Sequence, residues 1–189
     1  GVLICCGMIA AFIWAFYRTK QIGLDPDHLI NILLLVVPLG IIGARLYFVV
    51  LHWDVYGARP SLIPQIWRGG SAIHGGIIAG LLVWVIYSRY QRQSLRRWGD
   101  ILTPGLILAQ GIGRWGNYFN QEAYGYETDL PWAMLIDGAY RHPTFLYESI
   151  WDILGFLLLA YISKKNKYKT GDVMACYMIR YSVSRFFIE

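Results

Sequence analysis

The chain has 189 residues, of which 56% are hydrophobic and only 15% are charged. About a quarter of the residues in a soluble domain are charged, so this composition excludes an ordinary soluble domain and indicates a membrane protein. The net charge of +5 does not indicate nucleic-acid binding, because the basic residues lie in short clusters between long apolar blocks.

Long apolar blocks recur along the chain, and a membrane-spanning helix needs roughly 20 such residues. We predict an all-α, polytopic transmembrane protein forming one integral domain over residues 1–189. The six expected spans are 1–17, 29–51, 72–88, 100–113, 145–162 and 172–189. The fourth is short and contains Pro104, so we expect it to be kinked or partly re-entrant. Because both terminal spans break off abruptly, we expect truncation at both ends.

Basic residues divide unequally between the two sides of the predicted membrane domain. Ten follow the first, third and fifth spans, against four in the other connections. The positive-inside rule places the side with ten in the cytoplasm. The 52–71 and 114–144 connections then face outward, and the second is long enough for a small extracytoplasmic head.

Two connections carry more polar groups and glycines than membrane boundaries need. In the stretch W-R-G-G-S-A-I-H-G-G at 67–76, paired glycines permit tight turns, and His74 lies just inside a span. In the stretch 113–125, Arg114 and Glu122 stand with two asparagines among glycines and aromatics. A structural histidine and an interfacial aromatic belt are the alternatives to a functional site.

Charged residues also lie within the predicted spans. Arg185 and Glu189 are four residues apart on one helix face, so they can pair, and that pair is either structural or functional. Arg45 and Arg180 are either snorkelling or paired. The predicted topology brings His74, Arg114, His142, Arg185 and Glu189 to the outward side, with Arg45 in the outer half of its span.

Arginines, histidine and amides gathered at one leaflet suit an anionic lipid phosphate. Guanidinium groups hold phosphate in a planar fork, and they stabilise the charge that develops on a leaving group. No strong internal nucleophile accompanies these motifs, which favours direct transfer between two bound substrates.

The motif G-R-x-G-N-x-x-N-x-E-x-x-G at 113–125 resembles the signature of the prolipoprotein diacylglyceryl transferase family. Four further blocks resemble the family in the same order and cover nearly the whole chain: G-G-x-x-x-H-G-G at 69–76, G-A-R-L-Y at 43–47, H-P-T-x-x-Y-E at 142–148 and R-x-x-x-E at 185–189.

The resemblance implies an α-helical enzyme of the bacterial plasma membrane, with its active site toward the outer leaflet. The implied donor is phosphatidylglycerol, and the implied acceptor is the lipobox cysteine in the signal peptide of a prolipoprotein. The product is a thioether-linked diacylglyceryl group, and glycerol phosphate leaves. Membrane lipids are the expected surroundings, and no metal or organic cofactor is implied.

By motif position, the resemblance gives catalytic roles to three residues. Arg114 and Arg185 would bind the phosphate, and His74 would activate the thiol, with His142 as a second candidate for the base. Asn117, Asn120, Glu122 and Gly125 would shape the substrate site together with His142 and Arg45, and Glu189 would orient Arg185. The family also has a functional tyrosine just before the position of Gly1 and a further span after Glu189, which would make about seven spans, so activity is expected of the longer natural protein.

Two other classes of protein remain as alternatives. A lipid or anion transporter would place polar groups at several depths, and Asp152 and Arg180 are compatible with that pattern. A non-catalytic membrane scaffold would tolerate replacement of the Arg/Asn/Glu cluster. A metal-dependent hydrolase is disfavoured, because no motif has ligand spacing such as H-E-x-x-H.

Overall fold

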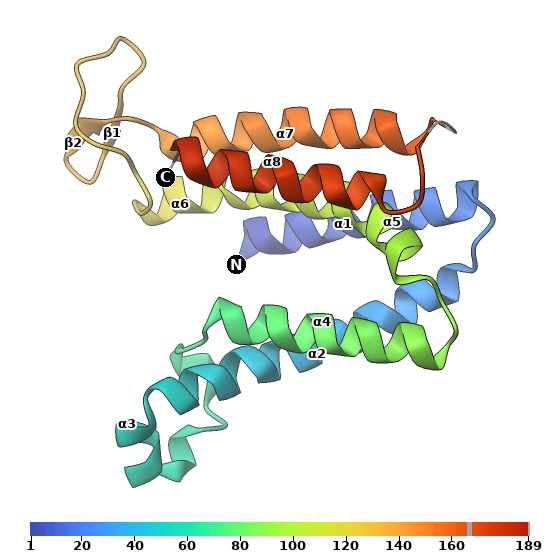
Figure 1. Cartoon of the computed structure of the whole chain (residues 1–189). Coiled ribbons are helices and arrows are strands. Elements are labelled where there is room, and N and C mark those ends of the chain that lie inside the picture. Colours follow the sequence, from blue (N-terminus) through green and yellow to red (C-terminus); the bar gives the residue numbers. More distant parts are fainter. Residues whose placement is uncertain (166–167, 189) are drawn as a thin grey trace. The chain divides into compact units, whose positions relative to one another are not determined.

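The computed structural model describes the backbone of residues 1–165 and 168–188, and the side chains as far as Phe186, and most of this chain is helical (Figure 1). Six long helices occupy the predicted spans: α1 (Val2–Gln21), α2 (Pro26–Leu51), α4 (Ile73–Tyr90), α5 (Leu95–Gly113), α7 (Thr144–Ser163) and α8 (Asp172–Ile188). The all-α class is therefore confirmed. Of these helices, α1, α2, α4 and α7 are long and apolar enough to cross a membrane.

The N-terminal boundary predicted for α5 was wrong. This helix begins at Leu95 instead of residue 100, so Arg96 and Arg97 lie in its first turn and Trp98 is buried beside them. The prediction treated the basic cluster as a connection, whereas the turn also carries an apolar side chain that packs inward. The helix runs without interruption through Pro104.

The chain divides into two compact units. The first contains residues 1–24 and 96–189, and the second contains residues 25–95. The second unit is built on α2 and α4, which pack closely along their lengths. The pairs Gly43–Gly75 and Gly40–Gly76 place the two helix backbones in contact, and His28 near the start of α2 meets Tyr87 near the end of α4. The two helices are therefore antiparallel, and small residues let them approach.

A 21-residue connection joins the facing ends of α2 and α4 in the second unit, from residue 52 to residue 72. It contains the short helix α3 (Trp53–Ala58) and two single 3-10 turns, η1 (Pro60–Leu62) and η2 (Ile66–Arg68). Prolines at 60 and 64 and glycines at 69 and 70 prevent a longer helix here.

The first unit contains α1, α5, α7 and α8, with α7 and α8 lying side by side (Figure 1). Its buried apolar cluster contains Ile107, Leu159, Val173 and Tyr177. At Gly155 of α7 the absence of a side chain makes room for the guanidinium of Arg180 on α8, because a Cβ there would lie 2.8 Å from Arg180 Nε.

Basic residues gather at one end of the first unit. There, Arg18 donates to the carbonyl oxygen of Ser163, and Asp100 accepts hydrogen bonds from the backbone N–H groups of Gly171 and Met174 at 2.6 and 2.9 Å. A shallow pocket there is lined by four basic residues: Arg18, Arg97, Lys165 and Lys169. Basic residues from three separate predicted cytoplasmic segments thus meet at one end of this unit.

At the other end of the first unit lie the short helix α6 (Trp115–Asn120) and a two-stranded hairpin. The antiparallel strands are β1 (Met134–Ile136) and β2 (Ala139–Arg141), joined at Asp137 and Gly138, whose φ angles are +50° and +77°. Two successive positive φ angles in an Asp-Gly turn are typical of tight hairpins. The sequence pattern predicted a head at 114–144 but no strands in it, although the Asp-Gly pair indicates a hairpin.

Candidate active site

Arg114 stands where α5 ends and α6 begins, and it forms an ion pair with Glu148 of α7. Its Nη2 lies 3.0 Å from Oε1 of Glu148, and the side chains are 24% and 4% exposed, respectively. A buried carboxylate needs a cation nearby, so Glu148 both requires Arg114 and restricts where its guanidinium lies. The exposed part of Arg114 leaves this charge accessible from outside the protein.

Arg185 of α8 acts on the same carboxylate. Its charge, like that of Arg114, lies close enough to Glu148 to interact electrostatically with it, and Arg185 is exposed. Residues from α7, α8 and the α5–α6 junction therefore form one charged cluster at the hairpin end of the first unit. The predicted pairing of Arg185 with Glu189 lies outside the described residues.

The junction between α5 and α6 is held by hydrogen bonds to α7. Trp115 donates from Nε1 to Oγ of Ser149 at 3.1 Å, and this hydroxyl donates in turn to the carbonyl oxygen of Gly111 at 2.8 Å. The rings of Trp115 and Phe145 also meet edge to face at 5.5 Å. Because Ser149 is buried next to Glu148, the same turn of α7 sets the position of both the junction and the ion pair.

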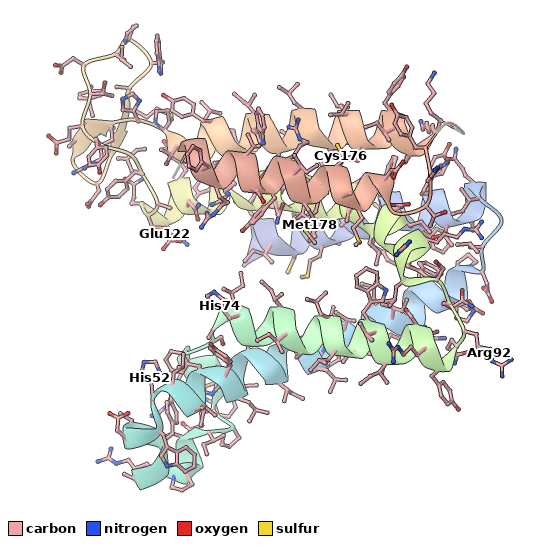
Figure 2. All side chains as sticks on the ribbon, in the orientation of Figure 1. His52, His74, Arg92, Glu122, Cys176 and Met178 are labelled. Atoms are coloured by element: carbon pink, nitrogen blue, oxygen red, sulfur yellow. The ribbon has the colours of Figure 1, made fainter. Side chains whose placement is uncertain are left out.

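The amides and the carboxylate of the 113–125 motif lie around the end of α6. Asn120 donates from Nδ2 to Oε1 of Glu122 at 2.8 Å, and both residues are exposed. The carbonyl oxygen of Asn117 accepts from the backbone N–H of Glu122 at 2.9 Å, and Gln121 adopts a left-handed conformation that ends the helix. Asn117, Asn120 and Glu122 are thus brought together at the end of α6, and Glu122 lies just beyond this helix (Figure 2).

Gly125 and His142 form a contact that leaves no space for a side chain at residue 125. The backbone N–H of Gly125 donates to the carbonyl oxygen of His142 at 3.1 Å, and a Cβ at Gly125 would lie 2.8 Å from Cβ of His142. The His142 ring lies 3.3 Å from the hydroxyl of Tyr147, measured at Nδ1, and Trp132 donates to that hydroxyl at 2.9 Å. Gly125 therefore allows His142 to lie against the segment that follows α6.

A hydrogen bond inside the head raises the pKa of Tyr124. Its hydroxyl donates to Oδ2 of Asp137 at 2.6 Å, and this bond is the main reason that the pKa lies above its usual value, with the negative charge of Asp137 contributing. The nearby guanidinium of Arg141, 4.7 Å from the Tyr124 ring, opposes the shift. The bond ties the hairpin turn to the segment after α6.

In the second unit, His74 lies in the first turn of α4, and Figure 2 labels it there. The residue is exposed, and its ring lies 6.4 Å from the ring of Tyr47 on α2, between centroids. The next residue, Gly75, is buried against the backbone of Gly43. The His74 imidazole is therefore accessible, while the backbone that carries it is held in place by close packing.

Arg45 has surroundings of a different kind. It is 4% exposed, and its guanidinium points at carbonyl oxygens of the 52–72 connection. The ring of Tyr56 lies 5.0 Å from Cζ of Arg45. These contacts place Arg45 inside the second unit and away from its exposed surface, although its motif position had predicted that it binds substrate.

Glu148 is the site residue to which the sequence analysis gave no role. It was part of the H-P-T-x-x-Y-E block, yet it was not a candidate. A carboxylate one turn into an apolar helix needs a partner, and Arg114 is the motif residue predicted at the same side of the membrane. Combining these two observations would have suggested the pair. Among the residues that the structure describes, no three His, Cys, Asp or Glu side chains gather to hold a metal ion.

The whole chain matches one known protein family. The family model described as "Prolipoprotein diacylglyceryl transferase" matches residues 1–189. The phosphatidylglycerol–prolipoprotein diacylglyceryl transferase of Clostridioides difficile strain 630 is 44% identical over 189 residues, which are 100% of this chain and 76% of that protein. The enzyme of the same name from Staphylococcus epidermidis strain RP62A is 43% identical over 201 residues, covering 100% of this chain and 71% of its own length.

Proposed function

Because this chain belongs to the prolipoprotein diacylglyceryl transferase family, we propose that it transfers the diacylglyceryl group of phosphatidylglycerol to the lipobox cysteine of a prolipoprotein signal peptide. The cysteine sulfur forms a bond to the terminal glycerol carbon of the diacylglyceryl group, and the bond from that carbon to the phosphate oxygen breaks. Glycerol phosphate leaves with the bonding electrons, and the thiol proton passes to a base.

The charged cluster at the hairpin end of the first unit is the observation that carries this proposal. Arg114 and Arg185 reach one carboxylate from two helical segments, and both are at least partly exposed. Two guanidiniums held in this way suit a phosphate diester and stabilise the second negative charge that it gains as glycerol phosphate leaves. Glu148 acts in the proposal as the residue that positions Arg114.

His74 is the proposed base for the thiol. Only the thiolate attacks effectively, and a neutral imidazole has one ring nitrogen with a free lone pair that can accept the thiol proton. Its exposure in the first turn of α4 supports this role. His142 remains the second candidate, and its contacts with Gly125 and Tyr147 favour a role in shaping the substrate site.

The proposal also includes a location. The protein belongs in the bacterial plasma membrane among membrane lipids, with the head at 114–144 outside the cytoplasm and the site toward the outer leaflet. The gathering of Arg18, Arg97, Lys165 and Lys169 at the opposite end of the first unit supports this orientation through the positive-inside rule. A reporter fused near Lys165 is expected to signal from the cytoplasm, and an outward signal would overturn the orientation.

Transfer is tested with the purified protein in vesicles that contain phosphatidylglycerol and a peptide carrying a lipobox cysteine. We expect the peptide to gain the mass of one diacylglyceryl group. A peptide with serine in place of the cysteine is the control and is expected to stay unmodified. Binding of the lipid by folded protein without any mass gain on the cysteine peptide would contradict the proposal and favour a transporter or a scaffold.

A further inference from the structure

All five N–H groups of Arg45 are directed at backbone carbonyl oxygens of the connection between α2 and α4. Nε donates to Ile63 at 2.9 Å, Nη1 donates to Gly69 and Gly70 at 2.6 and 2.7 Å, and Nη2 donates to Leu62 and Gln65 at 2.7 and 3.4 Å. A guanidinium has five such donors and no acceptor. The carbonyl oxygens therefore occupy the full donor set that a phosphate would need.

Two glycines make this arrangement possible. Gly69 and Gly70 have φ angles of +82° and +81°, and the ψ angle of Gly69 is −169°, a combination that is essentially restricted to glycine. This backbone path turns two successive carbonyl oxygens toward the same nitrogen atom. A Cβ at Gly70 would lie 2.8 Å from Nη1 of Arg45 and 2.7 Å from Phe48, whereas a Cβ at Gly69 would meet no atom within 4 Å.

The segment held by Arg45 leads directly to His74. After Gly70, the backbone N–H of Ala72 donates to the carbonyl oxygen of Ala44 at 3.0 Å, and α4 begins at the next residue. Gly75 then packs on Gly43. Contacts with the adjacent residues Gly43 and Ala44 of α2 thus fix the chain on both sides of His74.

We propose that Arg45 is a positioning residue, which holds residues 62–70 on α2 and thereby sets the place of His74, and that it does not bind the donor phosphate. A buried guanidinium without these carbonyl oxygens would be unpaired, and the connection without Arg45 would lose five hydrogen bonds at once. The inference rests on the proposed function only where it gives His74 its chemical role. The hold on the connection stands on the hydrogen bonds alone.

The test compares Arg45→Lys with Arg68→Lys, which replaces an exposed arginine of the same connection. Lysine keeps the charge but has three donors on one nitrogen, so it cannot satisfy five carbonyl oxygens. We expect backbone amides of residues 62–74 to exchange with deuterium at least about tenfold faster in Arg45→Lys, with amides of α7 unchanged, and no change in Arg68→Lys. Unchanged exchange in Arg45→Lys would overturn the proposal, even for a protein that proved to have no transferase activity.

Kinetics separate positioning from phosphate binding. In Arg45→Lys we expect kcat to fall about tenfold or more while KM for phosphatidylglycerol stays within about twofold, because the base is displaced and the lipid site is intact. A tenfold rise in KM with unchanged kcat would instead assign Arg45 to the lipid and overturn the proposal.

Gly70→Ala provides a second variant in case Arg45→Lys does not fold. It pushes on Nη1 of Arg45 without removing the charge, and Gly69→Ala is its control because it carries the same strained φ angle without the contact. Faster exchange at residues 62–74 in Gly70→Ala than in Gly69→Ala is the expected result. Equal exchange in these two variants would count against the role of Arg45.

Discussion

Two arginines that stand in similar motifs meet opposite surroundings in the two units. Arg114 keeps 24% of its side chain exposed and pairs with one buried carboxylate. Arg45 is 4% exposed and directs all of its donors at backbone carbonyl oxygens. The first arrangement leaves charge accessible at the surface, and the second directs all the donors at one long connection. The role of an arginine inside a membrane protein therefore has to be inferred from the groups that its N–H donors contact. Its presence in a motif does not distinguish an accessible charge from a guanidinium that holds the backbone.

The largest expected effect comes from Arg114→Lys. This variant keeps the positive charge of Arg114 but removes the planar guanidinium that can donate two parallel hydrogen bonds to a phosphate. We expect kcat/KM to fall about 10²- to 10³-fold, because stabilisation of the departing phosphate depends on donors in fixed positions. The measurement is transfer to the lipobox peptide at equal folded protein. Arg141→Lys is the matched control, since Arg141 pairs with the exposed Glu127 at 3.2 Å, and it is expected to stay near wild type. Wild-type turnover in Arg114→Lys would remove Arg114 from the phosphate role.

His74→Gln is expected to lower kcat about 10²-fold, while binding of phosphatidylglycerol changes less than twofold, because a general base acts on the chemical step. The control is His52→Gln in the same unit, where His52 lies at the end of α2 with its Nδ1 near the carbonyl oxygen of Phe48 (Figure 2). Lipid binding that weakens more than turnover does would argue against a base.

Glu148→Gln tests what holds Arg114 in place. The amide keeps the size of the side chain but removes the charge that pairs with both arginines, so we expect a loss of about tenfold in kcat/KM. That is less than the ~10²-fold that a ~1 Å misplacement of a reacting group costs. Glu127→Gln, on the exposed partner of Arg141, is the control. An unaltered enzyme in Glu148→Gln would show that Arg114 is positioned by other contacts.

Tyr124→Phe is expected to have the smallest effect, under twofold on activity at neutral pH. The hydrogen bond to Asp137 raises the pKa of Tyr124, so the folded state favours the neutral phenol. The stability that this bond contributes is present below the ordinary tyrosine pKa of about 10 and is lost as the pH rises through the raised value. Melting temperatures of wild type and variant should therefore differ below pH 10 and converge above the raised pKa. A constant difference across that range would contradict the assignment.

The helices could be predicted from the sequence because lipid imposes a strong and simple pattern. Apolar blocks located all six long helices, and the error at Leu95 arose where an apolar side chain packs inside a basic cluster. The α2–α4 connection could not be predicted in the same way. Its conformation depends on carbonyl oxygens that converge on one side chain, and no residue pattern reports the direction of a carbonyl group.

The candidate site was likewise predictable from the sequence only in part. The motif at 113–125 pointed to Arg114, while Glu148 remained unassigned because its partner is 34 residues away in the chain. Arg45 belonged to a motif block and was expected to bind substrate, although its five contacts favour a positioning role. The motif blocks therefore identified candidate residues, whereas the contacts of Arg114 and Arg45 distinguish a partly exposed charge from one that holds the backbone.

One measurement tests the central claim most directly. Thioether-linked peptide and glycerol phosphate are quantified together in a single turnover, with wild-type protein and with Arg114→Ala. Our account predicts equal amounts of the two products with wild type and neither product with folded Arg114→Ala. Glycerol phosphate without modified peptide, or transfer that persists in Arg114→Ala, would contradict it.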